Sequence, residues 1–370
     1  MDNKPLLWVC SLQYSPIYKS HCCALGRQAE KNGYRIRYLF SNAYSWMLSD
    51  DIREKTVFIG NSVGILSSVS DGFGISIRSK LKDLIKKEKP DYVYFYNFHP
   101  FLNYYIASLV KKYNCTFIQH VQEPYVEEKQ VYRGTQQFWL NWFEYLQEQL
   151  LKKTDIAIVS SERSHFLFLK RYPFFSGKLL TIPLMYEDQA TNPDGGILKR
   201  RYITFIGPPV PAKGTDIFLQ IVRNSHEKKF PYQFQLITRK LITDEKFFHY
   251  PNLQITYQEK ISDEEMGNHL RQSLMVVTPY LVATQSSVVL TSFMFGTPAL
   301  SSNVGGLPEF VSHRKTGYIL APTDPIDDWI GGIIYIFDNF NQMSDECKKF
   351  FIENFSERNW PKYFKFLFQK

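Results

Sequence analysis

The chain has 370 residues, of which 44% are apolar and 22% charged, as in ordinary globular proteins, and its length predicts two domains. All of the formal net charge of +8 lies in residues 1–185, which hold 24 Lys and Arg against 16 Asp and Glu. A basic half favours an anionic partner such as a phospholipid surface, although a solvated surface without a partner remains the alternative. Nucleic acid is disfavoured, because no recognition motif accompanies the charge.

Cysteine usage and hydropathy exclude further classes. None of the five cysteines has the spacing of a metal site, and an odd number without a framework indicates a reducing compartment. The start MDNKPLLWVCSL is too short in its apolar part for a secretory signal, and no run of about 18 apolar residues predicts a membrane span. We expect a cytoplasmic protein without a bound metal that can touch the inner face of a membrane.

Strand and helix patterns alternate through the first half of the chain. Strand-like apolar runs occupy residues 6–12, 35–40, 91–98, 115–120 and 155–161. Helical spacing lies between them at 21–34, 77–90, 101–114 and 137–154, with Gly33 as a C-cap and Pro90 as a stop signal. This alternation predicts an α/β fold with a parallel sheet covered on both faces.

A polar, Pro- and Gly-containing segment at 185–201 interrupts the pattern and predicts an interdomain linker. Strand patterns then return at 202–207, 232–238, 253–258 and 274–280, with helical patterns at 214–225 and 263–273. Two doubly wound domains in tandem fit this order. Ligands of such sheets bind at the carboxyl ends of the strands.

Three stretches of the second half resemble the GT-B glycosyltransferases, in particular the retaining family 4. They are YITFIGPPVPAKGTDIFLQIV (202–222), ISDEEMGNHLRQSLMVVTPY (261–280) and GGLPEFVSHRKTGYIL (305–320). The first half resembles the family more weakly, through its strand order, KPDYVYFYNFHP (89–100) and a His at a strand end. The resemblance implies two Rossmann-like domains facing a cleft. It assigns 1–185 to the acceptor, 186–354 to the nucleotide sugar, and 355–370 to a helix that packs back on the first domain.

The resemblance also assigns the donor site. A departing nucleotide diphosphate develops negative charge, which a cation and backbone N–H groups stabilise. Lys213 matches the family's lysine, and the Thr/Ser-rich turn that enters the apolar helix in ATQSSVVLTSFMF (283–295) offers an N-terminal anion site. The glycine pair can let the backbone approach a ligand. The candidate donor-binding residues are Gly207, Lys213, Thr284, Gln285, Ser286, Ser287, Thr291, Gly305, Gly306 and Glu309.

Several family positions are replaced. The family's arginine is Pro208 here, so a second cation could come only from Arg239 or Lys240, at the end of the next predicted strand. The family's two glutamates correspond to Ala283, or Val282 in a shifted alignment, and to Thr291. Residues 266–308 contain no carboxylate at all.

The first half offers histidines in place of the family's glycine pair. Lys19, Ser20 and His21 are predicted to occupy the turn after the first strand. His120 matches a family histidine near the reacting carbon and is, with Lys213, a candidate catalytic residue. His21, His99 and Glu123 are candidates for the acceptor side, and Glu127 can supply or orient a base. The alternative for each His is a strand-end side chain bonded to the backbone.

Together these features predict a metal-independent enzyme without a cofactor that moves a hexose from a nucleotide-diphosphate sugar. The expected acceptor is a glycan or a lipid-linked glycan, in surface polysaccharide biosynthesis. The missing glutamates favour an alternative, a catalytically degenerate GT-B subunit that binds a glycan or a partner. A GT-B epimerase or phosphorylase is a third hypothesis. Retention or inversion stays open, because the residues that mark retention are replaced.

Overall fold

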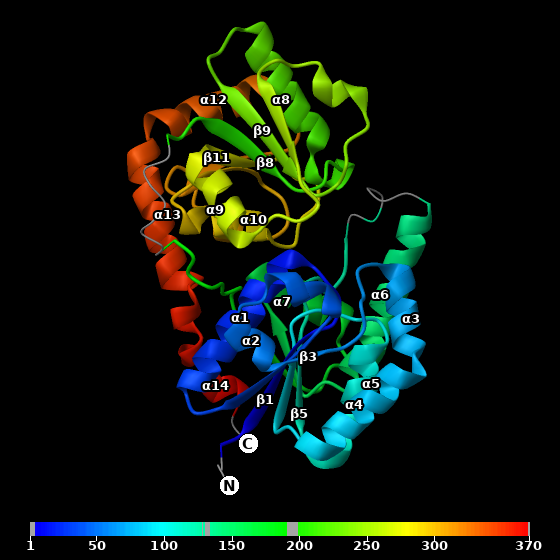
Figure 1. The fold of residues 1–370 in the computed structure, drawn as a ribbon. Coiled ribbons are helices and arrows are strands. Elements are labelled where there is room, and N and C mark those ends of the chain that lie inside the picture. The colour runs from blue at the N-terminus through cyan, green and yellow to red at the C-terminus, as the bar shows by residue number, and fades with distance from the viewer. Residues whose placement is uncertain (1–3, 128, 130–133, 191–198, 369–370) are drawn as a thin grey trace. The chain divides into compact units, whose positions relative to one another are not determined.

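The computed structural model describes residues 4–127, 129, 134–190 and 199–368. The chain divides into two compact units (Figure 1). The first contains residues 4–127, 134–187 and 356–368, and the second is built mainly from Asp188–Phe355. The predicted boundaries, after 185 and after 354, lie within two residues of these. Most of the predicted linker, 191–198, lies outside the described residues.

Each unit is built on one parallel sheet. The first sheet has the order β3-β2-β1-β4-β5-β6-β7 and the second the order β10-β9-β8-β11-β12-β13. In the first unit the strands are β1 (Leu6–Ser11), β2 (Arg35–Phe40), β3 (Thr56–Phe58), β4 (Tyr92–Phe95), β5 (Thr116–His120), β6 (Ile156–Val159) and β7 (Lys178–Thr181). In the second they are β8 (Tyr202–Ile206), β9 (Gln233–Thr238), β10 (Leu253–Tyr257), β11 (Ser273–Thr278), β12 (Ala299–Ser302) and β13 (Gly317–Leu320).

Helices connect successive strands in both units, as parallel pairing requires. The helices of the first unit are α1 (Pro16–Lys31), α2 (Asp50–Glu54), α3 (Ile65–Phe73), α4 (Ile75–Glu88), α5 (Leu102–Val110), α6 (Thr135–Leu151), α7 (Glu162–Arg171) and α14 (Pro361–Leu367). Those of the second are α8 (Thr215–Glu227), α9 (Asp263–Gln272), α10 (Ser287–Met294), α11 (Leu307–Phe310), α12 (Ile326–Asp338) and α13 (Phe340–Asn354). No helix in the described part of the chain is long and apolar enough to span a bilayer.

The predicted turn after the first strand is wrong in one respect. Helix α1 begins at Pro16, so Lys19, Ser20 and His21 lie in its first turns and not in a loop. Proline at the first helical position suits this start, because its ring presets the backbone and its missing N–H needs no partner there. The sequence pattern identified only the later turns, where apolar residues recur.

The last residues return to the first unit, where α14 packs against α1. The Tyr92 hydroxyl on β4 donates to the carbonyl oxygen of Phe368 at 2.7 Å. The Trp360 ring lies 5.1 Å from the His21 ring, centroid to centroid. The terminal segment therefore completes the core of the first unit.

A half-buried arginine, Arg200, fixes the start of the second unit. The Arg200 guanidinium donates to the carbonyl oxygens of Leu270, Ser273 and Phe295 and to the Thr297 hydroxyl, at 2.6–3.3 Å. Burial lowers the pKa of Arg200 to about 10. Its hydrogen bonds join the end of α9, the start of β11 and the end of α10. One side chain thus connects a strand of the second sheet to two of the helices next to it.

We predict that Arg200→Met destabilises the second unit by about 3 kcal/mol or more, because it leaves several buried acceptors unpaired. Thermal and denaturant unfolding will measure the change. The neighbouring Arg201, which is exposed and lies over the Tyr202 ring, provides the control. Arg201→Met should alter stability by less than about 1 kcal/mol. Equal effects of the two substitutions would contradict an anchoring role of Arg200.

Candidate active site

The second sheet changes winding direction at its centre. β8 lies between β9 and β11, so the chain turns to one side after β8 and later continues on the other. Ligands of open α/β sheets bind beyond the carboxyl ends of the strands at such a point. The three loops after β8, β11 and β12 leave neighbouring strands at this edge, and they hold most of the predicted donor residues.

Two glycines clamp the loop that follows β11. A Cβ on Gly214 would lie 1.6 Å from the carbonyl oxygen of Pro279, and a Cβ on Gly305 would lie 1.5 Å from that of Ala283. Both glycines have positive φ, 63° and 54°. The amides of Leu281 and Val282 donate to the carbonyl oxygen of Ala212 at 2.9 and 3.3 Å. Residues 279–283 are therefore held between the loops after β8 and β12.

Lys213 lies in this cluster of loops, at the end of the short helical turn η4 (Pro211–Lys213). Its Nζ atom donates to the Tyr280 hydroxyl at 3.0 Å and lies 4.3 Å from the centroid of the Tyr280 ring. Gly207, with φ of 124°, lies directly beside it, since a Cβ there would be 3.5 Å from Nζ. The structure thus brings Lys213 and Gly207 together. Tyr280 was missed by the sequence analysis; its only signal was an aromatic residue directly after a strand.

The N-terminus of α10 follows the clamped loop. Its cap residue Ser286 makes no side-chain capping hydrogen bond, and the side chain is only 4% exposed. Among the described residues, Ser286 Oγ and Gln285 Oε1 are buried polar atoms without a hydrogen-bond partner. Buried polar atoms almost always have one. Ser287 begins the helix, whose first N–H groups have no intrahelical acceptor, and Thr284 precedes the cap with contacts of its own.

The replaced family positions have ordinary local roles. The Thr291 hydroxyl donates to the Ser287 carbonyl oxygen at 2.7 Å, so it keeps only its lone pairs for another group. Glu309 is exposed in the first turn of α11, and the Gly306 amide donates to Ala283. Arg239 donates to the carbonyl oxygen of Ile261 at 3.1 Å. Within the described residues, no three His, Cys, Asp or Glu side chains converge as metal ligands.

The first unit buries two of the predicted histidines in one hydrogen-bonded chain. The Met185 amide donates to His21 Nδ1 at 3.3 Å, which leaves Nε2–H of His21 to donate to the Tyr94 hydroxyl at 2.9 Å. Tyr94 then donates to His120 Nδ1 at 2.9 Å, and His120 Nε2 donates to Ser160 Oγ at 2.6 Å. His21 is 0% and His120 1% exposed. Both nitrogens of each ring are engaged.

His99 has a third buried position. Its Nδ1 accepts from the amides of Phe101 and Leu102 at 3.3 and 3.1 Å, so the side chain caps α5. Its Nε2 lies 3.0 Å from Ser62 Oγ, which donates to the Asp71 carboxylate at 2.5 Å. In this structure His21, His99 and His120 are buried, and their neutral imidazoles satisfy buried partners. The catalytic role of His120 and the acceptor-side roles of His21 and His99 stay predictions from the sequence.

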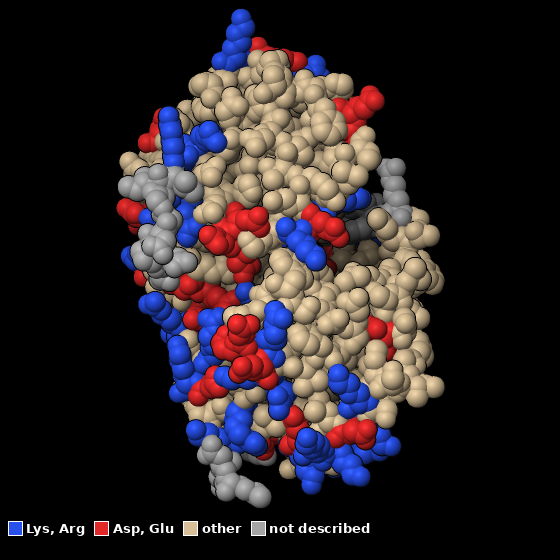
Figure 2. Space-filling model, in the orientation of Figure 1, with Lys and Arg blue, Asp and Glu red and all other residues tan. Residues whose placement is uncertain are grey.

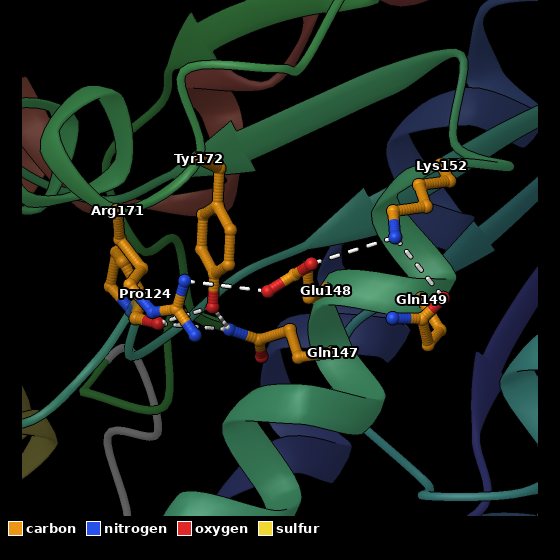
Figure 3. A network of polar contacts seen from close by, with 7 residues as sticks. All are labelled: Pro124, Gln147, Glu148, Gln149, Lys152, Arg171 and Tyr172. Carbon is orange, nitrogen blue, oxygen red and sulfur yellow. Dashed lines mark hydrogen bonds and ion pairs between the residues drawn. The ribbon is translucent and has the colours of Figure 1, made fainter.

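Glu123 and Glu127 follow β5 on a loop that the surrounding helices fix. Gln147 on α6 donates to the Pro124 carbonyl oxygen at 3.2 Å and to the Tyr172 hydroxyl at 2.9 Å, and Tyr172 donates to Pro124 at 2.6 Å (Figure 3). The Glu127 carboxylate pairs with Arg163 and Lys170. Glu123 is exposed. Glu127 is therefore held in ion pairs, and of the two described glutamates of this loop Glu123 is the more accessible.

Comparison with protein-family models covers most of the chain. Residues 200–339 match the model described as glycosyl transferases group 1, and residues 19–187 match that of glycosyltransferase family 4. Two curated proteins are distant relatives. An MMP α-(1→4)-mannosyltransferase of Mycolicibacterium hassiacum is 20% identical over 67% of this chain and 63% of its own length. A D-inositol 3-phosphate glycosyltransferase of Paenarthrobacter aurescens is 23% identical over 39% of this chain and 37% of its own. The match thus spans less than two thirds of either relative.

Solved structures share the fold along almost the whole chain. Sucrose-phosphate synthase of Thermosynechococcus elongatus has a TM-score of 0.73 at 13% identity, over 99% of this chain and 98% of its own. A glycosyltransferase of Rickettsia africae has a TM-score of 0.70 at 13% identity, over 100% of both chains. HepE of Anabaena, solved in complex with UDP-glucose, has a TM-score of 0.70 at 11% identity, over 98% of both.

The buried histidines predict a pH dependence of stability. Burial lowers the pKa of His99 and of His120 to about 3, and that of His21 well below its ordinary value. In the unfolded chain a histidine binds a proton near pH 6.5, whereas in the folded chain these histidines stay neutral to lower pH. Each of them therefore lowers the free energy of unfolding as pH falls from about 6.5 towards 3. The slope is about 1.4 kcal/mol per pH unit for each group. His120→Gln should remove one such share of the slope.

Unfolding free energies between about pH 6 and pH 4 will measure this slope. His226 is exposed on α8, and His226→Gln should leave the slope of the unmodified protein unchanged. An unchanged slope in His120→Gln would mean that His120 is protonated freely in the folded chain. The catalytic role predicted for His120 from the sequence would then gain support.

Proposed function

This chain belongs to the group 1, family 4 glycosyltransferases and has the GT-B fold, and from that premise we propose a specific activity. It transfers a hexose from a nucleotide-diphosphate sugar to a glycan or lipid-linked glycan, in surface polysaccharide synthesis at an anionic membrane. The observation that supports this most is the placement of Lys213. Its amine lies at the winding reversal of the second sheet, beside a glycine and next to the loop that enters α10.

Lys213 has the chemistry that the bond cleavage requires. When the bond between the sugar carbon and the diphosphate oxygen breaks, negative charge accumulates on the leaving oxygen. One N–H of the Lys213 ammonium goes to Tyr280, and the other two are directed by that bond and by the ring beneath. A preorganised cation of this kind lowers the barrier because no reorganisation is needed when charge develops. The N-terminus of α10 adds N–H groups for the same phosphates.

The acceptor needs no strong base in this proposal. The departing diphosphate oxygen can take the proton of the attacking hydroxyl, so the burial of His120 is compatible with transfer. Glu123, exposed after β5, is the more accessible of the two described glutamates of that loop for orienting an acceptor hydroxyl. The donor sugar lies against Val282 and Ala283, where the family resemblance predicts a carboxylate. We propose that this contact is made by backbone groups of the clamped loop.

One observation favours a second candidate, a GT-B subunit that binds a glycan or partner without transfer. The positions of the family's glutamates and arginine hold side chains that cannot carry charge. Pro208 and Ala283 offer no side-chain hydrogen bond, and the Thr291 proton is used within α10. Nucleotide binding and slow hydrolysis of a nucleotide sugar distinguish the two, because only the transferase should have both.

We predict that Lys213→Ala lowers donor turnover about a hundredfold or more, since removal of a preorganised donor costs roughly 2.7–4 kcal/mol of transition-state stabilisation. Binding of UDP or GDP should weaken as well, measured as a smaller thermal shift on nucleotide addition. Lys349, exposed on α13 of the same unit, is the control, and Lys349→Ala should retain both properties. Wild-type turnover and nucleotide affinity in Lys213→Ala would move the binding-subunit hypothesis to first place.

Ser286→Ala gives a second test, because only the transferase hypothesis predicts an effect on nucleotide binding. If Ser286 Oγ meets a nucleotide sugar, its loss should weaken nucleotide binding about five- to tenfold, the share of one hydrogen bond. If no ligand binds, removal of a buried hydroxyl without a partner should leave stability equal or higher. Ser225 on α8, whose buried Oγ also has no hydrogen-bond partner, is the matched control, and Ser225→Ala should leave nucleotide binding unchanged. Calorimetric titration with UDP, with melting temperatures of the free proteins, measures both effects.

A further inference from the structure

Helix α3 has its polarity reversed. A helix on a globular protein normally turns its apolar side towards the core. Here the buried residues of α3 are Ser68, Asp71 and Gly72. Ser68 Oγ donates to Gln13 Oε1 at 2.5 Å, and Asp71 accepts from Ser62. The apolar side of α3 is consequently turned outwards, and the packing of the first unit does not account for it.

The outward side chains are unusually exposed. Leu66 on α3 and Ile75 at the start of α4 are each 87% exposed, and Val63 and Phe73 are 58% and 60% exposed. Aliphatic side chains that project into water to this extent gain nothing from the fold. A continuous apolar patch on a globular protein usually marks a place of contact. We call these four residues the α3 patch.

A row of aromatic rings extends the α3 patch to α6. The Phe73 ring lies 4.9 Å from Phe101, and Phe101 lies 5.6 Å from Trp142. Trp142 contacts Trp139 at 5.4 Å, and Trp139 contacts Phe138, which is 64% exposed, at 5.6 Å. On the face shown in Figure 2, the flank of the first unit where α3 and α6 lie is almost free of charged side chains.

An open groove of about 430 Å³ adjoins this surface. Phe101 and Arg78 border it, together with Tyr104, Tyr105 and Tyr145 from α5 and α6. The Arg78 guanidinium lies 5.4 Å from the centroid of Phe73 and 5.1 Å from that of Tyr105. An apolar surface, aromatic rings and a cation therefore meet at one place.

Basic side chains continue from the patch along the same face of α4. Ile75, Ser79, Lys82 and Lys86 are spaced by four, three and four residues, which places them in one row of a helix. All four are exposed. In Figure 2, Lys and Arg side chains gather over the region of α4, beyond the uncharged flank. The apolar patch thus has a positively charged border.

We propose that the α3 patch inserts into the interface of an anionic lipid bilayer, with the lysines of α4 against the lipid headgroups. Apolar and aromatic side chains bordered by lysines are typical of surfaces that lie in a membrane interface. Protein–protein interfaces, by contrast, are depleted in lysine. The α3 patch and the lysines of α4 are thus the residues that would make the membrane contact of the proposed function. The inference rests on exposed side chains of the first unit and does not depend on the donor site.

Vesicle binding by the full chain tests this. We expect co-sedimentation with vesicles of phosphatidylcholine and phosphatidylglycerol, and weak co-sedimentation with phosphatidylcholine alone. Leu66→Ser/Ile75→Ser should lower partitioning at least about tenfold, because two apolar side chains no longer leave water. Leu241 and Phe248 in the second unit are 61% and 62% exposed, and Leu241→Ser/Phe248→Ser is the matched control.

The charged border has its own variant pair. Lys82→Gln/Lys86→Gln should weaken binding several-fold at low salt and have little effect at high salt, where the surface potential is screened. Lys348→Gln/Lys349→Gln on α13 alters the same charge on another exposed surface and should bind as the unmodified protein does. All variants should keep wild-type melting temperatures and the same thermal shift with UDP, which separates this inference from the proposed donor chemistry.

Three results would overturn the proposal. The first is absence of binding to anionic vesicles at low salt. The second is unchanged binding of Leu66→Ser/Ile75→Ser, which would mean that charge alone attracts the protein. The third is a concentration-dependent dimer that Leu66→Ser/Ile75→Ser dissociates, together with vesicle binding that does not change; the patch would then be covered by a second copy of the chain.

Discussion

The second unit depends on a steric constraint between backbones. The carbonyl oxygens of Pro279 and Ala283 lie where a side chain on Gly214 or Gly305 would begin. Any other residue at those two positions would force the loop after β11 away from its neighbours, at the cost of a positive φ as well. Because this loop is held on both sides, the entrance to α10 and the Lys213 turn have a fixed relation. A site for a diphosphate needs such a relation, since charge stabilisation depends on groups that are already in place.

The corresponding edge of the first unit is filled in another way. One chain of hydrogen bonds joins His21 on α1, Tyr94 on β4, His120 at the end of β5 and Ser160 after β6, and Trp360 from the returning C-terminal segment packs against it. Neutral histidines and tyrosines of this kind satisfy each other without water, which makes the cluster rigid and sensitive to acid. The carboxyl ends of the two sheets therefore differ. The second sheet has glycines, the Lys213 amine and the N-terminus of α10 there, whereas the first has a buried cluster of hydrogen-bonded polar side chains.

The loop after β11 lacks the carboxylate that the family resemblance predicts for the sugar side of the donor site. The resemblance to family 4 predicts a glutamate at this position, whereas this loop presents Val282 and Ala283 with their backbone hydrogen-bonded to Ala212 and Gly306. An added carboxylate here would be partly buried, as Val282 and Ala283 are, and would be costly without a partner. Under the proposed function, the phosphate side of the site is retained and the sugar side is changed. The exposed α3 patch lies on the other unit, so membrane contact and donor binding can vary independently.

The sequence by itself determined the alternation of strands and helices, and with it two parallel sheets, because the periodicity of apolar residues is a local property. It also named Lys213, Gly305 and the turn before α10 as candidates for the donor site, since a glycine at a tight turn and a cation after a strand can be recognised from the sequence pattern. It placed Lys19–His21 in a turn wrongly, because the polar first turns of α1 carry no apolar repeat. Only the tertiary structure decided that His21, His99 and His120 are buried, that Tyr280 holds Lys213, and that α3 turns its polar side inwards. These properties depend on which neighbours a side chain meets across the fold, and residues such as His21 and Met185 meet only when strands distant in sequence are brought together.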